Sequence, residues 1–85
     1  MRVIAIDFDN TLYDGIDIIE KGRALLMKYY REPDTCIIIY TARRWEDFFI
    51  VKTILDFERI PYDAIVCEKL RADLYIDDKA EKFEW

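Results

Sequence analysis

The stretch that decides the fold is Val3-Ile4-Ala5-Ile6-Asp7-Phe8-Asp9-Asn10-Thr11-Leu12, close to the amino terminus. Residues 2–6 form a short β-rich run, typical of a strand, and this run stops abruptly at Asp7. Because side chains alternate along a strand, Asp7 and Asp9 can face the same way at its exit. An isolated pair of this kind more often belongs to a turn or a helix cap. Whether Asp7 and Asp9 form part of a functional site therefore depends on the other polar residues of the chain.

Strand-like and helix-like segments alternate downstream of this stretch. The β-branched run Cys36–Tyr40 is typical of a strand buried on both faces, and hence of a parallel sheet. Hydrophobic periodicity and the positions of proline and glycine predict the remaining elements. These elements are a helix over about 18–31, a helix over about 45–59, and short strands at 64–67 and 74–76.

The predicted order is strand, helix, strand, helix, strand, strand. This order predicts one α/β domain over residues 1–85, with helices on both faces of a mostly parallel sheet. In open sheets of this kind, ligands bind beyond the carboxyl ends of the strands, where the strand order reverses. Residues that directly follow the strands are therefore the first candidates for a functional site.

The second predicted helix is apolar on two sides. At about 100° per residue, one side carries Trp45, Phe48, Phe49, Val51 and Leu55, and the other carries Ile50, Ile54 and Phe57. One sheet can cover only one of these sides. Two interpretations stay open: a generously apolar helix in a compact core, or a surface used for homo-oligomer formation or for contact with substrate.

Composition and charge restrict the class of protein. Hydrophobic residues make up 53% of the chain and aromatic residues 15%, which is too many for a disordered protein. The net charge of −5 and the isoelectric point near 4.6 argue against general binding to nucleic acid or to an anionic membrane. We expect a cytoplasmic protein, because the apolar run at the amino terminus is far too short for a signal peptide or a membrane span.

The cysteine and histidine content restricts the chemistry. The two cysteines, Cys36 and Cys67, lie in apolar segments and are expected to be reduced and buried. The sequence contains no histidine, so any acid–base chemistry falls to carboxylates, lysine, tyrosine or cysteine.

Three further polar features accompany the Asp7–Asp9 pair. Thr41 directly follows the second predicted strand, Lys69 precedes the fourth, and Asp77-Asp78 directly follows the fourth. An acidic pair, a strand-final threonine, a lysine and a second acidic pair, in this order, form a specific signal. This constellation argues for a functional site over a simple turn.

On these residues the chain resembles the core of the haloacid dehalogenase superfamily, over residues 3 to about 80. The matching segments are Asp7–Leu12 for the first motif, Ile37–Arg43 for the second, Lys69 for the third and Tyr75–Asp78 for the fourth. The resemblance implies a minimal Rossmann-like three-layer sandwich with a four-stranded sheet in the order 3-2-1-4. It also implies a Mg²⁺-dependent phosphohydrolase that acts on phosphate monoesters.

The resemblance also implies catalytic roles. Asp7 would be the nucleophile that forms an aspartyl phosphate. Asp9 would protonate the leaving oxygen and then deprotonate the water that breaks the intermediate. Thr41 would bind a phosphoryl oxygen, and Lys69 would neutralise charge on the nucleophile and the phosphoryl group.

The metal ligands are implied in the same way. Mg²⁺ would be bound by Asp7, by the backbone carbonyl of Asp9 and by Asp77, with Asp78 contributing directly or through water. The residue types suit this ion, because Mg²⁺ prefers carboxylate, carbonyl and water oxygens.

The chemistry supports these residue types without reference to the family. Hydrolysis of phosphate monoesters requires an enzyme to supply on the order of 20 kcal/mol or more, and a carboxylate nucleophile splits the reaction into two easier steps. A divalent cation and Lys69 would remove the repulsion between anionic Asp7 and an anionic phosphate. Asp9 must carry a proton near neutral pH, and a nearby carboxylate raises a carboxyl pKa.

Several neighbouring residues have two interpretations. Asn10 is more often a turn residue than a ligand, and Thr11 either caps the turn or supports the loop. Arg43 and Arg44 are more often solvated side chains than contacts for a substrate anion. Tyr13 either lines the pocket for the leaving group or packs in the core.

The chain departs from the usual family pattern after the first motif. Only residues 12–17 separate the motif from the first helix, so we expect no cap domain and a flap that is very short or missing. An open site of this kind suits a small phosphorylated substrate such as a sugar phosphate, a nucleotide or a polynucleotide end, or a site that a second subunit completes. The rival hypothesis is a non-catalytic module that binds Mg²⁺ and phosphate, or accepts a phosphoryl group on Asp7 as a receiver domain does.

Overall fold

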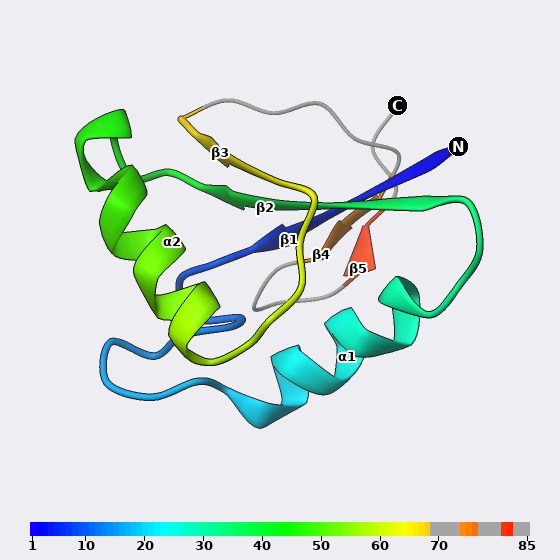
Figure 1. The fold of residues 1–85 in the computed structure, drawn as a ribbon, viewed down its shortest axis with the longest axis horizontal. Helices are drawn as coiled ribbons and strands as arrows, with labels where there is room; N and C mark the ends of the chain where they lie inside the picture. The colour runs from blue at the N-terminus through cyan, green and yellow to red at the C-terminus, as the bar shows by residue number, and fades with distance from the viewer. Residues whose placement is uncertain (69–73, 77–80, 83–85) are drawn as a thin grey trace.

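The computed structural model describes residues 1–68, 74–76 and 81–82. Its elements are β1 (Arg2–Asp7), α1 (Glu20–Tyr30), β2 (Thr35–Thr41), a 3-10 turn η1 (Trp45–Asp47), α2 (Phe48–Phe57), β3 (Ala64–Cys67), β4 (Leu74–Ile76) and β5 (Glu81–Lys82). The predicted α/β fold is confirmed, because three parallel strands, β3, β2 and β1, are connected through two helices (Figure 1).

The register of the sheet brings the ends of neighbouring strands together. β1 pairs with β2 along its whole length, from Arg2 opposite Thr35 to Asp7 opposite Tyr40. β2 pairs with β3 as far as Thr41 opposite Cys67. On the other side of β1, β4 pairs in parallel and β5 adds antiparallel to β4, so the strand order is β3-β2-β1-β4-β5.

The expectation of helices on both faces of the sheet is wrong for the described residues. Figure 1 shows α1 and α2 on the same side of the strands. The connections β1-α1-β2 and β2-α2-β3 both step in the same direction across the sheet, and right-handed crossovers in one direction place their helices on one face.

One core therefore unites both helices with the sheet. Leu26 of α1 and Leu55 of α2 are fully buried, and they belong to the same cluster as the inward side chains of the strands. The strand residues in this cluster are Ile4, Ile6, Ile37, Ile39, Ile65, Leu74 and Ile76. Each such isoleucine or leucine contributes about 1.5–3 kcal/mol on burial.

The outer side of η1 and α2 stays exposed. Val51 and Leu55 face the core, whereas a second set of large apolar side chains is at least half exposed. This set comprises Trp45, Phe49, Ile50 and Phe57. The predicted division of the helix into two sides is therefore wrong in part, because Trp45 and Phe49, expected on the side of Val51 and Leu55, are exposed together with Ile50 and Phe57. The helix does leave large apolar side chains uncovered within the single chain, and the homo-oligomer stays a prediction. No helix in the described ranges is long and apolar enough to cross a membrane.

Candidate active site

The candidate site begins where β1 ends. Asp7 is the last residue of β1, and the Phe8 amide continues the ladder by donating to the Tyr40 carbonyl at 3.0 Å. The chain then turns sharply, because the amides of Leu12 and Tyr13 both donate to the Phe8 carbonyl, at 2.9 and 3.0 Å. Asn10 has a positive φ of 65°, which asparagine tolerates better than most residues, so it acts as the turn residue.

A short flap follows this turn. Tyr13 forms isolated bridges with Asp9 and Ile18, and the Asp14 amide donates to the Asp17 carbonyl at 3.0 Å. Asp14 Oδ1 accepts the amides of Ile16 and Asp17, each at 2.8 Å. Of the two expectations, a very short flap or a missing one, the structure shows a very short flap. Within residues 1–68 no cap domain interrupts the fold.

The far end of the turn packs closely on α1. Gly22 is buried in the first half of α1, and a Cβ placed there would collide with the carbonyl group of Thr11. The Thr11 hydroxyl is buried and has no hydrogen-bond partner among the described residues, which does not support the capping role considered for it. Gly22 thus fixes the turn by close backbone contact, a feature that sequence reasoning missed.

The side chains of Phe8 and Tyr13 pack against each other beneath the turn that follows β1. Phe8 is fully buried, and its ring stacks on that of Tyr13 with 5.3 Å between centroids. The Tyr13 hydroxyl donates to the Gly15 carbonyl at 3.1 Å. These contacts favour core packing as the role of Tyr13.

Thr41 and Asp9 meet at the adjacent strand ends. Thr41 is the last residue of β2 and is only 2% exposed. Its hydroxyl donates to Asp9 Oδ2 at 3.3 Å and accepts the Arg43 amide at 3.1 Å. Asp7 lies on the neighbouring strand β1, opposite Tyr40, which is the residue before Thr41. The structure therefore brings Asp9 and Thr41 into contact at the carboxyl ends of β1 and β2, where Asp7 is the last residue of β1.

Arg43 is the principal unexpected member of the site. Its Nη2 donates to Asp9 Oδ1 at 2.7 Å, and its Nε donates to Oδ2 at 3.0 Å. The guanidinium also lies over the Phe8 ring, with its central carbon 5.5 Å from the centroid. The hydrogen bond to Asp9 raises the pKa of Arg43, and desolvation acts in the opposite direction. The expectation of a solvated Arg43 is wrong, because a charge-assisted, two-point pair holds it in place.

The remaining predicted site residues lie outside the described part of the chain. Lys69, Asp77 and Asp78 belong to this group. Within the described ranges, no cluster of three or more histidine, cysteine or acidic residues gathers in a way that could hold a metal ion. The oxygen donors at the β1 exit, the Asp7 carboxylate and the Asp9 main-chain carbonyl, are nevertheless of the kind that Mg²⁺ prefers.

The two cysteines take no part in this arrangement. Burial raises the pKa of both the Cys36 and the Cys67 thiols, so neither is activated as a nucleophile. Both are free thiols, as expected, but only Cys67 is buried; Cys36 is partly exposed, so the expectation of two buried cysteines is wrong for Cys36.

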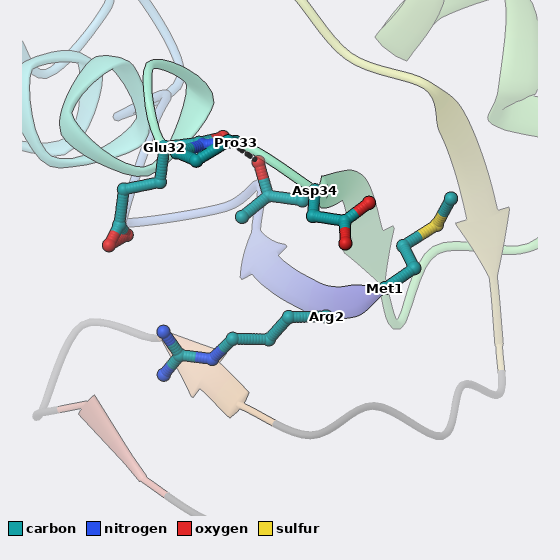
Figure 2. Close-up of a pocket in the computed structure, with 6 residues that line it drawn as sticks. Met1, Arg2, Glu32, Pro33 and Asp34 are labelled. Carbon is teal, nitrogen blue, oxygen red and sulfur yellow. Dashed lines mark hydrogen bonds between the residues drawn. The ribbon is translucent and has the colours of Figure 1, made fainter.

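A separate hollow lies at the opposite end of the sheet. Figure 2 shows it beside the starts of β1 and β2, with Met1, Arg2 and Glu32 among its lining residues. At its wall, the Thr35 hydroxyl donates to the Glu32 carbonyl at 2.8 Å. Parallel α/β sheets bind ligands at the carboxyl ends of their strands, so this hollow is not the candidate active site.

The comparisons with known proteins add no assignment. The chain matches no protein-family model, no curated protein and no solved structure. The functional interpretation therefore depends on the residues and geometry of the site itself.

Proposed function

We propose that the protein is a Mg²⁺-dependent phosphohydrolase of the haloacid dehalogenase type, acting on phosphate monoesters through an aspartyl phosphate on Asp7. The observation that carries this proposal is that Asp7 ends β1 beside the end of β2, where the Thr41 hydroxyl donates to Asp9. A Rossmann-like sheet with a 3-2-1-4 core order belongs to the same proposal. The proposed substrate is a small phosphorylated compound, because the short flap leaves the site open.

In the first step, a carboxylate oxygen of Asp7 attacks phosphorus. The bond from phosphorus to the ester oxygen breaks, and that oxygen takes a proton from the Asp9 carboxyl group. The Thr41 hydroxyl, which is buried at the end of β2, would donate a hydrogen bond to a phosphoryl oxygen during this step.

In the second step, water attacks the phosphorus of the aspartyl phosphate. Asp9 accepts a proton from this water, the bond between phosphorus and the Asp7 oxygen breaks, and inorganic phosphate leaves. Asp7 is restored as a carboxylate. The sequence of steps uses no histidine, in keeping with the composition of the chain.

Mg²⁺ would be held by Asp7, the Asp9 carbonyl, Asp77 and Asp78. When bound, it supplies positive charge that offsets repulsion between the nucleophile and the phosphate. Lys69 would add a second positive charge to the same end of the site.

A second candidate function is supported by one specific observation. Both Asp9 carboxylate oxygens are engaged by Arg43, and a carboxylate held in this way does not activate water. A phosphoacceptor module, which receives a phosphoryl group on Asp7 and retains it, would have no need of a free Asp9. The two candidates differ in turnover.

The deciding experiment measures hydrolysis of a generic aryl phosphate with and without Mg²⁺. If the protein is a phosphohydrolase, the intact chain should show metal-dependent turnover, and Asp7→Asn should lose it. The matched control is Asp17→Asn, an identical chemical change at an exposed flap residue, which should retain full activity. Absence of metal-dependent turnover in the intact chain would favour the phosphoacceptor module.

A further inference from the structure

The hydrogen-bond donors around Asp9 form an anion-binding arrangement that the chain itself fills. Thr41 Oγ1 lies 3.3 Å from Asp9 Oδ2, and Arg43 Nε lies 3.0 Å from the same oxygen. Arg43 Nη2 lies 2.7 Å from the other oxygen, Oδ1. A hydroxyl and two donors of one guanidinium therefore converge on a single carboxylate.

We infer that the Asp9 carboxylate occupies the place of the substrate phosphoryl group, which binds Thr41 and Arg43 by displacing it. The inference rests on the phosphate-binding part of the proposed function, and it adds Arg43 as a phosphate-binding residue. In the structure as it stands, an internal anion satisfies the donors that the substrate would use.

The chemistry of the donors permits this exchange. A guanidinium presents a planar fork that matches two oxygens of either a carboxylate or a phosphate. The Thr41 hydroxyl can donate to either group as well. A phosphoryl group has one more free oxygen than a carboxylate and a larger charge, so it competes effectively for the same donors.

The surroundings of Arg43 allow it to stay in place while Asp9 leaves. Its guanidinium lies over the ring of Phe8, which is fully buried and stacked on Tyr13. Its amide donates to Thr41 Oγ1 at 3.1 Å, which ties the loop to the end of β2. These two contacts do not involve the Asp9 side chain.

Solvent and ligand can reach the pair. The Asp9 side chain is 38% exposed and that of Arg43 is 29% exposed. An anion can therefore approach the guanidinium from the open side, and the Asp9 side chain has room to turn away. The displaced Asp9 is then free to meet the ester oxygen, as its proposed role requires.

The neighbouring Arg44 provides a natural comparison. Its side chain is 79% exposed and pairs loosely with Glu46 at 3.5 Å. It carries the same charge as Arg43 one residue away, but its partner in the described part of the chain is Glu46 and not Asp9. A nonspecific attraction of phosphate to positive charge would depend on both arginines, whereas the inferred site depends on Arg43.

The experiment measures binding of inorganic phosphate by isothermal titration calorimetry at a fixed Mg²⁺ concentration. Arg43→Gln should weaken phosphate binding about tenfold or more, because it removes charged hydrogen bonds to the anion. Asp9→Asn should tighten phosphate binding about a few-fold, because it removes the charge of the carboxylate that competes with phosphate for the same donors. Arg44→Gln should bind as the wild type does.

The double variant Arg43→Gln/Asp9→Asn separates exchange from simple charge repulsion. If Asp9 competes for Arg43, the gain from Asp9→Asn disappears once Arg43 is absent, as non-additivity between contacting residues requires. A gain that persists in the double variant would overturn the inference. Unchanged phosphate affinity in Arg43→Gln, or weaker binding in Asp9→Asn, would also overturn it.

Circular dichroism of each variant checks that it folds. If Arg43→Gln does not fold, Arg43→Lys tests the same point, because it keeps the charge and loses the fork, and its phosphate affinity should fall. Unchanged affinity in Arg43→Lys would then count against the inference. Phosphate binding requires no turnover. If the protein binds phosphate in this pattern but does not hydrolyse aryl phosphate, the proposed phosphohydrolase activity is refuted and the inferred exchange is not. If the protein hydrolyses aryl phosphate but Arg43→Gln leaves its affinity for inorganic phosphate unchanged, the inferred exchange is refuted and the proposed activity is not.

Discussion

Gly22 in α1 touches the carbonyl group of Thr11 so closely that no Cβ fits between them. This contact joins the helix that covers the sheet to the turn that carries Asp9. The position of the candidate site in space therefore depends on a residue with no side chain, well separated in the sequence from the carboxylates it helps to place.

Gly22→Ala should destabilise the fold by about 3 kcal/mol, because the added methyl group forces backbone apart in a packed region. Urea unfolding measures the change. The control is Gly15→Ala in the flap, where φ is +104° and a Cβ would meet nothing within 4 Å. That control should lose only about 1 kcal/mol, through backbone strain. A Gly22→Ala protein as stable as the wild type would contradict the close contact.

The two sides of α2 should respond very differently to truncation. Leu55 is fully buried in the shared core, whereas Phe57 is 82% exposed. Leu55→Ala should cost about 2–5 kcal/mol, from lost burial and the cavity left behind. Phe57→Ala should stay within about 0.5 kcal/mol of the wild type. Equal losses in urea unfolding would show that the helix is packed in another way.

Asp14 should stabilise the flap only while it is ionised. The amides of Asp17 and Ile16 hold the pKa of Asp14 below its ordinary value in the folded protein. The carboxylate therefore contributes stability above the unfolded-state pKa, and this contribution is lost as the pH falls through the lower, folded-state pKa. The wild type should be more stable than Asp14→Ala at about pH 7, and the difference should shrink towards about pH 3. A difference in unfolding free energy that does not change with pH would contradict this account.

Strand positions were predictable because their sequence signals are local. The bounds of β3 and β4 agree with the prediction, and β2 and the abrupt end of β1 at Asp7 were predicted correctly to within a residue or two. The start of the second helix was less exact, because Trp45–Asp47 forms a 3-10 turn before α2 begins at Phe48. β5 was missed, since Glu81 and Lys82 carry neither apolar character nor alternation.

The contacts of the site were harder to predict, because they depend on pairs of residues far apart in the sequence. Thr41 and Asp9 were expected to meet, and they do. Arg43 resembled any solvated arginine, and only the turn of the chain after β2 brings it onto Phe8 and Asp9. The importance of Gly22 was equally hidden, because a glycine in a helical pattern does not reveal which backbone approaches it. The metal ligation by Asp77 and Asp78 and the role of Lys69 stay predictions.

The most direct test of the central proposal is detection of the aspartyl phosphate itself. Asp9→Asn should be incubated with an aryl phosphate and Mg²⁺, quenched in acid and examined by mass spectrometry of the intact protein and its peptides. Asp9→Asn should accumulate one phosphoryl group on the peptide that contains Asp7, because the residue proposed to activate water has been removed. A phosphoryl group on any other residue, or none in Asp9→Asn while the wild type still hydrolyses the substrate, would contradict Asp7 as the nucleophile.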